Sequence, residues 1–283
     1  MTRYSWILAG FIYIFLVYFY ASQVHSEIPG VKTVEQTYPG FASGLLKDAK
    51  MVAIKEGTLL VSEGIEIRQS QLKKTVEEAD PKIREELGKN LFFILEQEAM
   101  KALLVKEARS LGAVSKSLPD AEAIQAHLNE KFRDVQVSDE DAKTFYETNK
   151  AMFGELPFEQ VKETIQQVLV EQKRQDAFAS YLQGLGRKAD IRVNKGWVKA
   201  QYAIAMDNPV DKARMSDKPT MVEFGAKVCV PCDLMQPILD NLRKKYPEKL
   251  NVVFVHVGEN QILGARFGIQ SIPVQVFYAR NGK

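Results

Sequence analysis

The order of elements around the only two cysteines, Cys229 and Cys232, constrains the fold most strongly. An apolar run, TMVEF (220–224), comes shortly before the pair, and residues 233–242 after it have the apolar spacing of a helix. The segments that follow resemble in turn a strand, a helix and a strand: 250–257, 261–269 and 273–279. Alternation of strands and helices predicts an α/β sheet for the C-terminal third of the chain.

The spacing of the cysteines is compatible with a redox pair, half of a zinc site, or two inert buried thiols. A structural zinc ion needs about four ligands. The remaining candidates lie far apart in the sequence: His25, His127 and His256. A cysteine at a helix N-terminus meets unpaired N–H groups and the positive end of the helix dipole, which stabilise a thiolate. A second cysteine one turn later can close a disulfide, and Pro231 suits the first turn. These features favour the redox pair, with no metal.

The first 26 residues are read as a signal peptide or a membrane anchor. After Arg3 no charged side chain occurs until Glu27, and the apolar core spans 6–21. That core is longer than a usual signal peptide core and shorter than a usual spanning helix, so both readings stay open. Either one exports the rest of the chain, because the positive end stays in the cytoplasm. We expect the cell envelope, and in a Gram-negative host the periplasm. An uncleaved leader would tether the protein to the membrane.

The remaining sequence predicts a multidomain protein, which a length of 283 residues can accommodate. Residues 27–57 lack periodicity and are expected to be a spacer, whereas 58–195 begin with a hairpin at 58–67 and continue as amphipathic helices. Residues 196–283 form the α/β domain. The fold class is therefore an α-helical domain followed by an α/β domain. Lys and Arg number 38 against 36 Asp and Glu, and this balance gives no support for nucleic acid as a partner.

Two stretches of the helical part, VSDEDAKTFYETNKAMFG and PFEQVKETIQQVLVEQKRQDAFASYLQGLGRKADIRVN, resemble the helical region of SurA-like periplasmic chaperones. The family usually carries a parvulin prolyl-isomerase domain between these pieces. Here Phe153-Gly154 runs almost directly into Pro157, which leaves no room for that domain. The resemblance implies a module over 58–195 that binds unfolded clients, and it assigns that role to no single residue.

The C-terminal segment, with PTMVEFGAKVCVPC, RFGIQSIPV and NGK in this order and spacing, resembles thioredoxin. The resemblance implies a thioredoxin fold in which Cys229 is the exposed nucleophile and Cys232 the resolving thiol. Pro273 would be a cis-proline beside the pair, and the backbone of Ile272 would face the substrate. Glu223 takes the place of the family's buried aspartate, where it could accept the proton of Cys232. The alternative for Glu223 is a strand residue that faces solvent.

The sequence departs from the thioredoxin pattern at several positions. Val228 replaces the usual tryptophan, Val230 the usual glycine, and Phe254 a lysine found near the buried acid in many members. Without that lysine, a proton relay through Glu223 is in doubt. The sequence ends with NGK at 281–283, where the family continues with a strand and a helix. We therefore expect an incomplete thioredoxin-like domain, either a piece of a longer chain or a degraded fold.

These features predict a protein-disulfide oxidoreductase that needs no cofactor. Its clients would be unfolded or disulfide-containing exported proteins, and a membrane thiol protein would donate its electrons. The apolar residues between the cysteines, Val230 and Pro231, stabilise a thiolate little, which favours reductase or isomerase over oxidase. One alternative is a non-catalytic chaperone that uses the thioredoxin-like domain for docking. Another is an enzyme dedicated to one client, such as an apocytochrome thiol.

Overall fold

The computed structural model describes residues 30–110 and 117–282. The chain divides into two compact units, Met1–Lys32 and Thr33–Lys283, and the helices and strands of the described residues lie in the second. The leader predicted at 1–26 lies outside the described residues. Within the described ranges, none of the helices combines the length and apolar character that crossing a membrane requires.

A small mixed sheet organises the first part of the second unit. Its strands are β1 (Lys50–Val52), β2 (Thr58–Ser62), β3 (Ile65–Arg68) and β4 (Arg192–Asn194), in the order β1-β4-β2-β3. The antiparallel pair of β2 and β3 confirms the predicted hairpin. By contrast, β4 comes from far along the sequence to pair parallel with β1 and antiparallel with β2. The sequence did not reveal β1 and β4, because strands of three residues are too short to show alternation.

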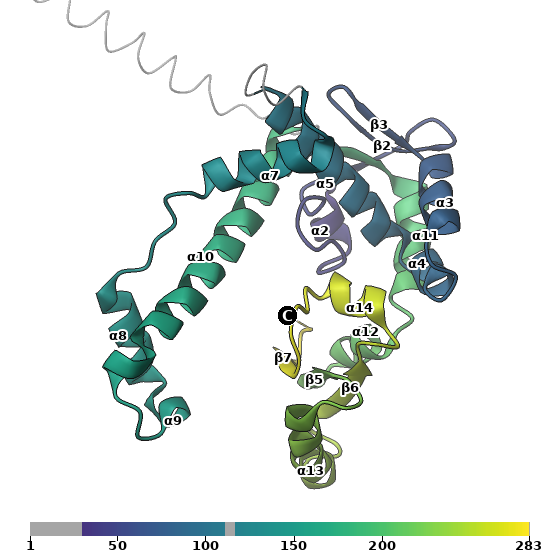
Figure 1. Cartoon of the computed structure of the whole chain (residues 1–283). Helices are drawn as coiled ribbons and strands as arrows, with labels where there is room; N and C mark the ends of the chain where they lie inside the picture. The colour runs from purple at the N-terminus through teal and green to yellow at the C-terminus, as the bar shows by residue number, and fades with distance from the viewer. Residues whose placement is uncertain (1–29, 111–116, 283) are drawn as a thin grey trace, which may run out of the picture. The chain divides into compact units, whose positions relative to one another are not determined.

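Helices make up most of the remaining N-terminal part (Figure 1). They are α2 (Val34–Thr37), α3 (Gln69–Glu78), α4 (Arg84–Lys89), α5 (Leu91–Ser110), α7 (Asp120–Lys131), α8 (Asp139–Thr148), α9 (Lys150–Phe153), α10 (Phe158–Lys188) and α11 (Lys195–Ala205). The side chain of Ser138 caps α8 by accepting from the N–H of Asp141. The chain breaks between α4 and α5 at Asn90, whose side-chain amide donates to the Glu86 carbonyl.

Residues 33–52 do not form the spacer that the sequence predicted. Their apolar side chains belong to the main core, together with residues of α5, α10 and α11. Phe41 stacks on Phe92 with ring centroids 4.2 Å apart. The buried carboxylate of Glu96 accepts four hydrogen bonds, from the N–H and hydroxyl of Ser43 and from two further N–H groups at positions 44 and 46. The segment is therefore ordered by one distant acid and by ring packing, neither of which gives a periodic pattern.

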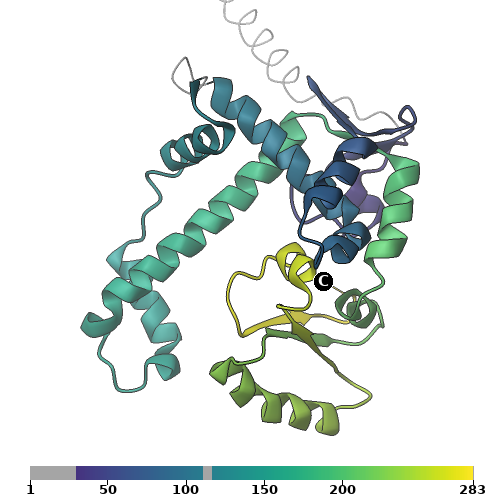
Figure 2. The ribbon, with the colours of Figure 1, turned by 45° about the vertical axis from the view of Figure 1, so that its right-hand side comes forward.

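The C-terminal part is the predicted α/β region. It contains α12 (Pro209–Arg214), β5 (Thr220–Gly225), α13 (Val230–Lys245), β6 (Asn251–His256), α14 (Gln261–Arg266) and β7 (Val274–Tyr278). The sheet order is β6-β5-β7, with β5 parallel to β6 and antiparallel to β7. Figure 2 shows α13 on one side of this sheet and α12 with α14 on the other. The fold class, a helical region followed by an α/β region, is confirmed.

The two sides of β5 differ in chemistry. Val222 and Phe224 are buried in an apolar cluster that includes Val210 of α12 and Leu263 of α14. Side chains alternate along a strand, so Glu223 and Gly225 face the other side, toward α13. One face of the sheet is thus an ordinary apolar core, and the opposite face is free to carry the cysteines.

A buried ionic cluster holds the apolar face together. The carboxylate of Asp211, fully buried in α12, accepts from Arg214 Nε at 2.5 Å and from Arg266 Nη1 at 2.8 Å. The Asn208 amide donates to the same carboxylate at 2.6 Å. Arg266 also donates to the Ala205 carbonyl at the end of α11, 3.1 Å away. Both arginines are nearly buried, so each depends on Asp211 for neutralisation.

We expect Asp211→Asn to lower the free energy of unfolding by about 3–5 kcal/mol, because removing one partner of a buried ionic pair leaves the other charge unpaired. Urea denaturation followed by circular dichroism measures the change. Asp207→Asn is the matched control, since Asp207 is 71% exposed and its pair with Lys212 is a surface pair. The control should change stability by about 0.5 kcal/mol or less. Equal changes in the free energy of unfolding for the two substitutions would contradict the stabilising role of the buried Asp211 carboxylate.

Candidate redox-active site

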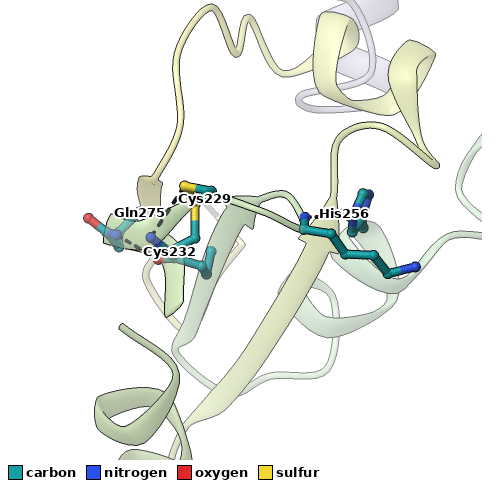
Figure 3. Close-up of a disulfide and its surroundings, with 6 residues drawn as sticks. Cys229, Cys232, His256 and Gln275 are labelled. Carbon is teal, nitrogen blue, oxygen red and sulfur yellow. Dashed lines mark hydrogen bonds between the residues drawn. A yellow bond between two sulfur atoms is a disulfide. The ribbon is translucent and has the colours of Figure 1, made fainter. Parts of the chain in front are cut away.

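The two cysteines form a disulfide at the start of α13, with a Cα–Cα distance of 5.2 Å. Cys229 is the N-cap residue of this helix, and its sulfur accepts from the backbone N–H of Cys232 at 3.3 Å. Cys229 is half-buried, whereas Cys232 is only 1% exposed. Figure 3 shows the bond between the two sulfur atoms. The sulfur that a client can reach is therefore that of Cys229, the residue predicted to be the nucleophile.

The residues on either side of Cys229 in the sequence are apolar and exposed. Val228 is 100% exposed, and Val230 is 71% exposed at the first position of α13. Pro231 follows within the first turn, where its missing N–H leaves no helical bond unmade. The two residues between the cysteines thus offer neither a charge nor a side-chain hydrogen-bond donor to a thiolate.

The turn that leads into β7 lies at the same end of the sheet. The Ile272–Pro273 peptide bond is cis, as the thioredoxin resemblance implies. Val274 pairs with Phe224 in the antiparallel register of β7 and β5. Pro273, one residue earlier, is therefore placed toward Gly225, from which the chain continues to Cys229. The fold brings the predicted substrate-binding residues Ile272 and Pro273 and the cysteine pair to one end of the sheet.

Glu223 lies in the middle of the sheet with no exposed surface. The reading of Glu223 as a solvent-facing residue is therefore wrong. Its Oε2 accepts from Gln275 Nε2 at 2.6 Å, and no group in residues 30–110 or 117–282 bonds its Oε1. Burial raises the pKa of Glu223, and the hydrogen bond from Gln275 acts in the opposite direction. Gln275 itself lies beside the cysteine pair (Figure 3).

Two features of this face were missed in the sequence. Gln275 is the polar partner of the buried acid, and finding it requires the register of β7 against β5. Gly225 is the second: a Cβ there would lie 2.9 Å from the Phe254 ring and 3.3 Å from Cys232 Sγ. Phe254, which pairs with Glu223 in the sheet register, therefore packs against a position where only glycine leaves room. The lysine expected near the acid is replaced by an aromatic ring on one side and an amide on the other.

Comparison with known proteins identifies the class of this domain. The family model for thioredoxin matches residues 202–283. The chain is 35% identical over 72 residues to thioredoxin of Alicyclobacillus acidocaldarius, covering 25% of this chain and 69% of that protein. It is 37% identical over 68 residues to thioredoxin of Rickettsia prowazekii, covering 24% of this chain and 64% of that protein. The chain belongs to the thioredoxin family.

A further relative and a solved structure give the same range of coverage. Thioredoxin of Haemophilus influenzae is 37% identical over 68 residues, which is 24% of this chain and 63% of that protein. The structure of a mutant thioredoxin from Halobacterium salinarum matches at 25% identity with a TM-score of 0.24, covering 25% of this chain and 62% of that one. The chain thus spans a little under two thirds of the length of most of these thioredoxins.

The raised pKa of Glu223 predicts how Glu223→Gln changes the dependence of stability on pH. A carboxyl group whose pKa is higher in the folded state contributes stability at low pH, and this contribution is lost as the pH rises through the folded pKa. The variant lacks the penalty for burying a charge, so it should be more stable than the wild type at pH 8. The advantage should shrink as the pH falls toward about 4, where the wild-type carboxyl is protonated.

Thermal unfolding of the oxidised proteins between pH 4 and pH 8 measures this difference. Glu248→Gln is the control, because the Glu248 side chain is 87% exposed. The difference in stability between the Glu248→Gln variant and the wild type should stay the same across this pH range. An advantage of Glu223→Gln that stayed constant across the range would refute the assignment of a raised pKa.

Proposed function

We propose that this protein is a thiol–disulfide oxidoreductase that reduces or isomerises disulfides of exported proteins. Membership of the thioredoxin family supports a thiol–disulfide oxidoreductase in the general sense. The observation that carries the proposal is the arrangement of the cysteines. A half-buried Cys229 caps a helix N-terminus and is joined to a fully buried Cys232 three residues later.

The reaction starts from the reduced pair. The N–H of Cys232 and the N-terminus of α13 stabilise a thiolate at Cys229. This thiolate attacks one sulfur of the client disulfide, forms a mixed disulfide, and releases the other client sulfur as a thiolate that takes a proton from water. Cys232 then attacks Cys229 Sγ, which forms the 229–232 disulfide and releases the second client thiolate. Two electrons pass from the pair to the client.

Glu223 and Gln275 serve the second of these steps. Cys232 is buried, so its thiol proton cannot pass directly to bulk water. A buried carboxylate with a raised pKa is a better proton acceptor for a thiol than an exposed one, because its basicity is higher. Gln275 binds only Oε2, which leaves Oε1 available for the proton. The amide therefore orients the acid and leaves its charge in place. A lysine ammonium would neutralise that charge.

The direction of electron flow follows from the residues between the cysteines. Val230 and Pro231 add no charge or side-chain hydrogen bond that would stabilise the Cys229 thiolate. A less stabilised thiolate corresponds to a more stable disulfide and a more reducing pair. The pair would need an external dithiol to regenerate it after each turnover. A membrane thiol protein of the envelope fits the expected export of the chain.

The helical part is proposed to hold the client, as its resemblance to SurA-like chaperones implies. A small separate cluster around Tyr146 and Ile165 supports α8, α9 and the first half of α10. Apolar side chains near it remain exposed: Met152 at 75%, Val168 at 53% and Leu156 at 50%. Exposed apolar side chains of this kind suit transient contact with unfolded segments.

We expect Cys232→Ser to trap the first intermediate. Without the resolving thiol, the mixed disulfide between Cys229 and a client cannot be released. Incubation of the reduced variant with a disulfide-containing unfolded protein should give a covalent adduct, which mass spectrometry assigns to Cys229. Cys229→Ser should form no adduct and should lose catalysis of disulfide reduction. In the protein that keeps Cys232, Glu223→Gln should slow resolution of the mixed disulfide about 100-fold, the low end for a positioned base.

A second experiment, with both cysteines replaced, distinguishes the enzyme from a chaperone that only docks through this domain. The double variant Cys229→Ser, Cys232→Ser keeps the helical part intact, so it should still suppress client aggregation. Its clients should retain their disulfides, whereas clients of the wild type lose or rearrange them. If clients of the wild type and the double variant kept the same disulfides, the proposed function would be wrong.

A further inference from the structure

His256 contacts the loop that carries the redox cysteines. It is the last residue of β6, paired with Gly225, the last residue of β5. Its Nε2 accepts a hydrogen bond from the backbone N–H of Lys227 at 2.9 Å. Lys227 stands two residues before Cys229. In Figure 3, His256 lies apart from the disulfide formed by Cys229 and Cys232. The contact is therefore indirect: His256 touches the loop and not the sulfur atoms.

This hydrogen bond exists only with a neutral imidazole. A backbone N–H can only donate, so Nε2 must lack a proton and the ring proton must sit on Nδ1. Nδ1 is buried, and no group in the described part of the chain bonds it. Gly258 lies close alongside: a Cβ there would be 3.4 Å from Nδ1. A second proton on the ring would convert Nε2 into a donor facing another donor, and the bond would break.

The loop needs this restraint because its next residue is strained. Val228 has a φ of +62°, a left-handed conformation that a β-branched side chain rarely adopts. Val228 is fully exposed, so its own side chain contributes no packing that would hold it. Strained conformations persist only where neighbouring contacts determine them. On the upstream side, those contacts are the Lys227 bond to His256 and the bond from the Val257 N–H to the Gly225 carbonyl, 2.9 Å long.

We propose that His256 is a positioning residue for the thiol–disulfide reaction: its neutral imidazole holds the 226–228 loop so that Cys229 is presented to the client, and protonation in acid releases the loop. This inference rests on the proposed function. A protonated imidazole has no acceptor nitrogen, so acid removes the bond to the Lys227 N–H. Without that bond the loop is free to relax from the strained conformation at Val228, and Cys229 reacts more slowly.

Other charged groups near His256 must be separated from its effect. On the loop and the turn after β6, the ammonium of Lys227 and the carboxylate of Glu259 pair with each other at 2.7 Å. On β5, Glu223 faces the same side of the sheet, and the first turn of α13 contributes Asp233. Glu223 and the cysteines also titrate, so a pH profile of the wild type alone is not diagnostic. A ratio of two proteins that differ only at position 256 removes those shared titrations.

The test compares His256→Gln with the wild type in catalysed reduction of a protein disulfide from pH 5 to pH 8.5. A glutamine oxygen can accept from the Lys227 N–H at every pH, so the variant keeps the bond and loses the titration. The ratio of kcat/KM, wild type over H256Q, should be near one at pH 8 and fall to about one tenth at pH 5. His256→Phe, which has no acceptor, should be slow at both pH values. A ratio that does not change with pH overturns the proposal.

Two controls keep this outcome distinct from other failures. His127→Gln changes a nearly buried histidine of the helical part, whose Nε2 lies 2.8 Å from the Tyr181 hydroxyl. Its ratio to the wild type should not vary with pH. If the wild type itself catalyses no disulfide reduction, the proposed function fails. If the wild type is active and H256Q follows it at every pH, only the role of His256 fails. Should H256F not fold, the H256Q ratio still decides.

Discussion

The arrangement of the C-terminal part depends on the buried ion pairs of the Asp211 carboxylate with Arg214 and Arg266. The carboxylate neutralises one arginine from its own helix and one from α14. The two arginines extend the cluster, because Arg214 approaches the Gly40 carbonyl at 3.4 Å and the Arg266 guanidinium lies over the Phe41 ring. The loop around residue 40, which no sequence pattern singles out, is thereby linked to the thioredoxin-like region. Without Asp211 these contacts would bring two like charges together in an apolar setting.

Fixing α12 and α14 on one face of the sheet determines what the other face can do. That face carries Glu223, Gly225, Phe254 and Gln275 in register, with His256 at its end. None of these residues is needed for the apolar core around Val222 and Phe224. The strand alternation that builds the core therefore also assembles, without further constraint, a row of chemically distinct side chains beneath the cysteine pair.

The sequence predicted those features of the fold and the site that depend on residues close together in the chain. The strand before the cysteines, the cysteine spacing and the helix after it follow from local pattern. Features that depend on register or on a distant partner were not accessible. Gln275 becomes the partner of Glu223 only once β7 pairs with β5, and residues 33–52 join the core through Glu96 and the stacking of Phe41 on Phe92. The Lys227–His256 bond joins residues 29 positions apart. Pattern recognition in one dimension cannot supply such pairs.

Replacing the lysine near the acid by Phe254 need not disable proton transfer. A nearby ammonium would stabilise the carboxylate and lower its pKa, which makes it a weaker base. Burial of Glu223 acts in the opposite direction and raises its pKa. The amide of Gln275 then provides orientation at one oxygen while leaving the other open. Gly225 makes room for the phenylalanine at position 254, since any larger side chain at 225 would collide with the Phe254 ring and crowd Cys232 Sγ. Phe254, Gln275 and Gly225 thus leave a buried acid with a raised pKa, held by an amide, beneath a buried thiol.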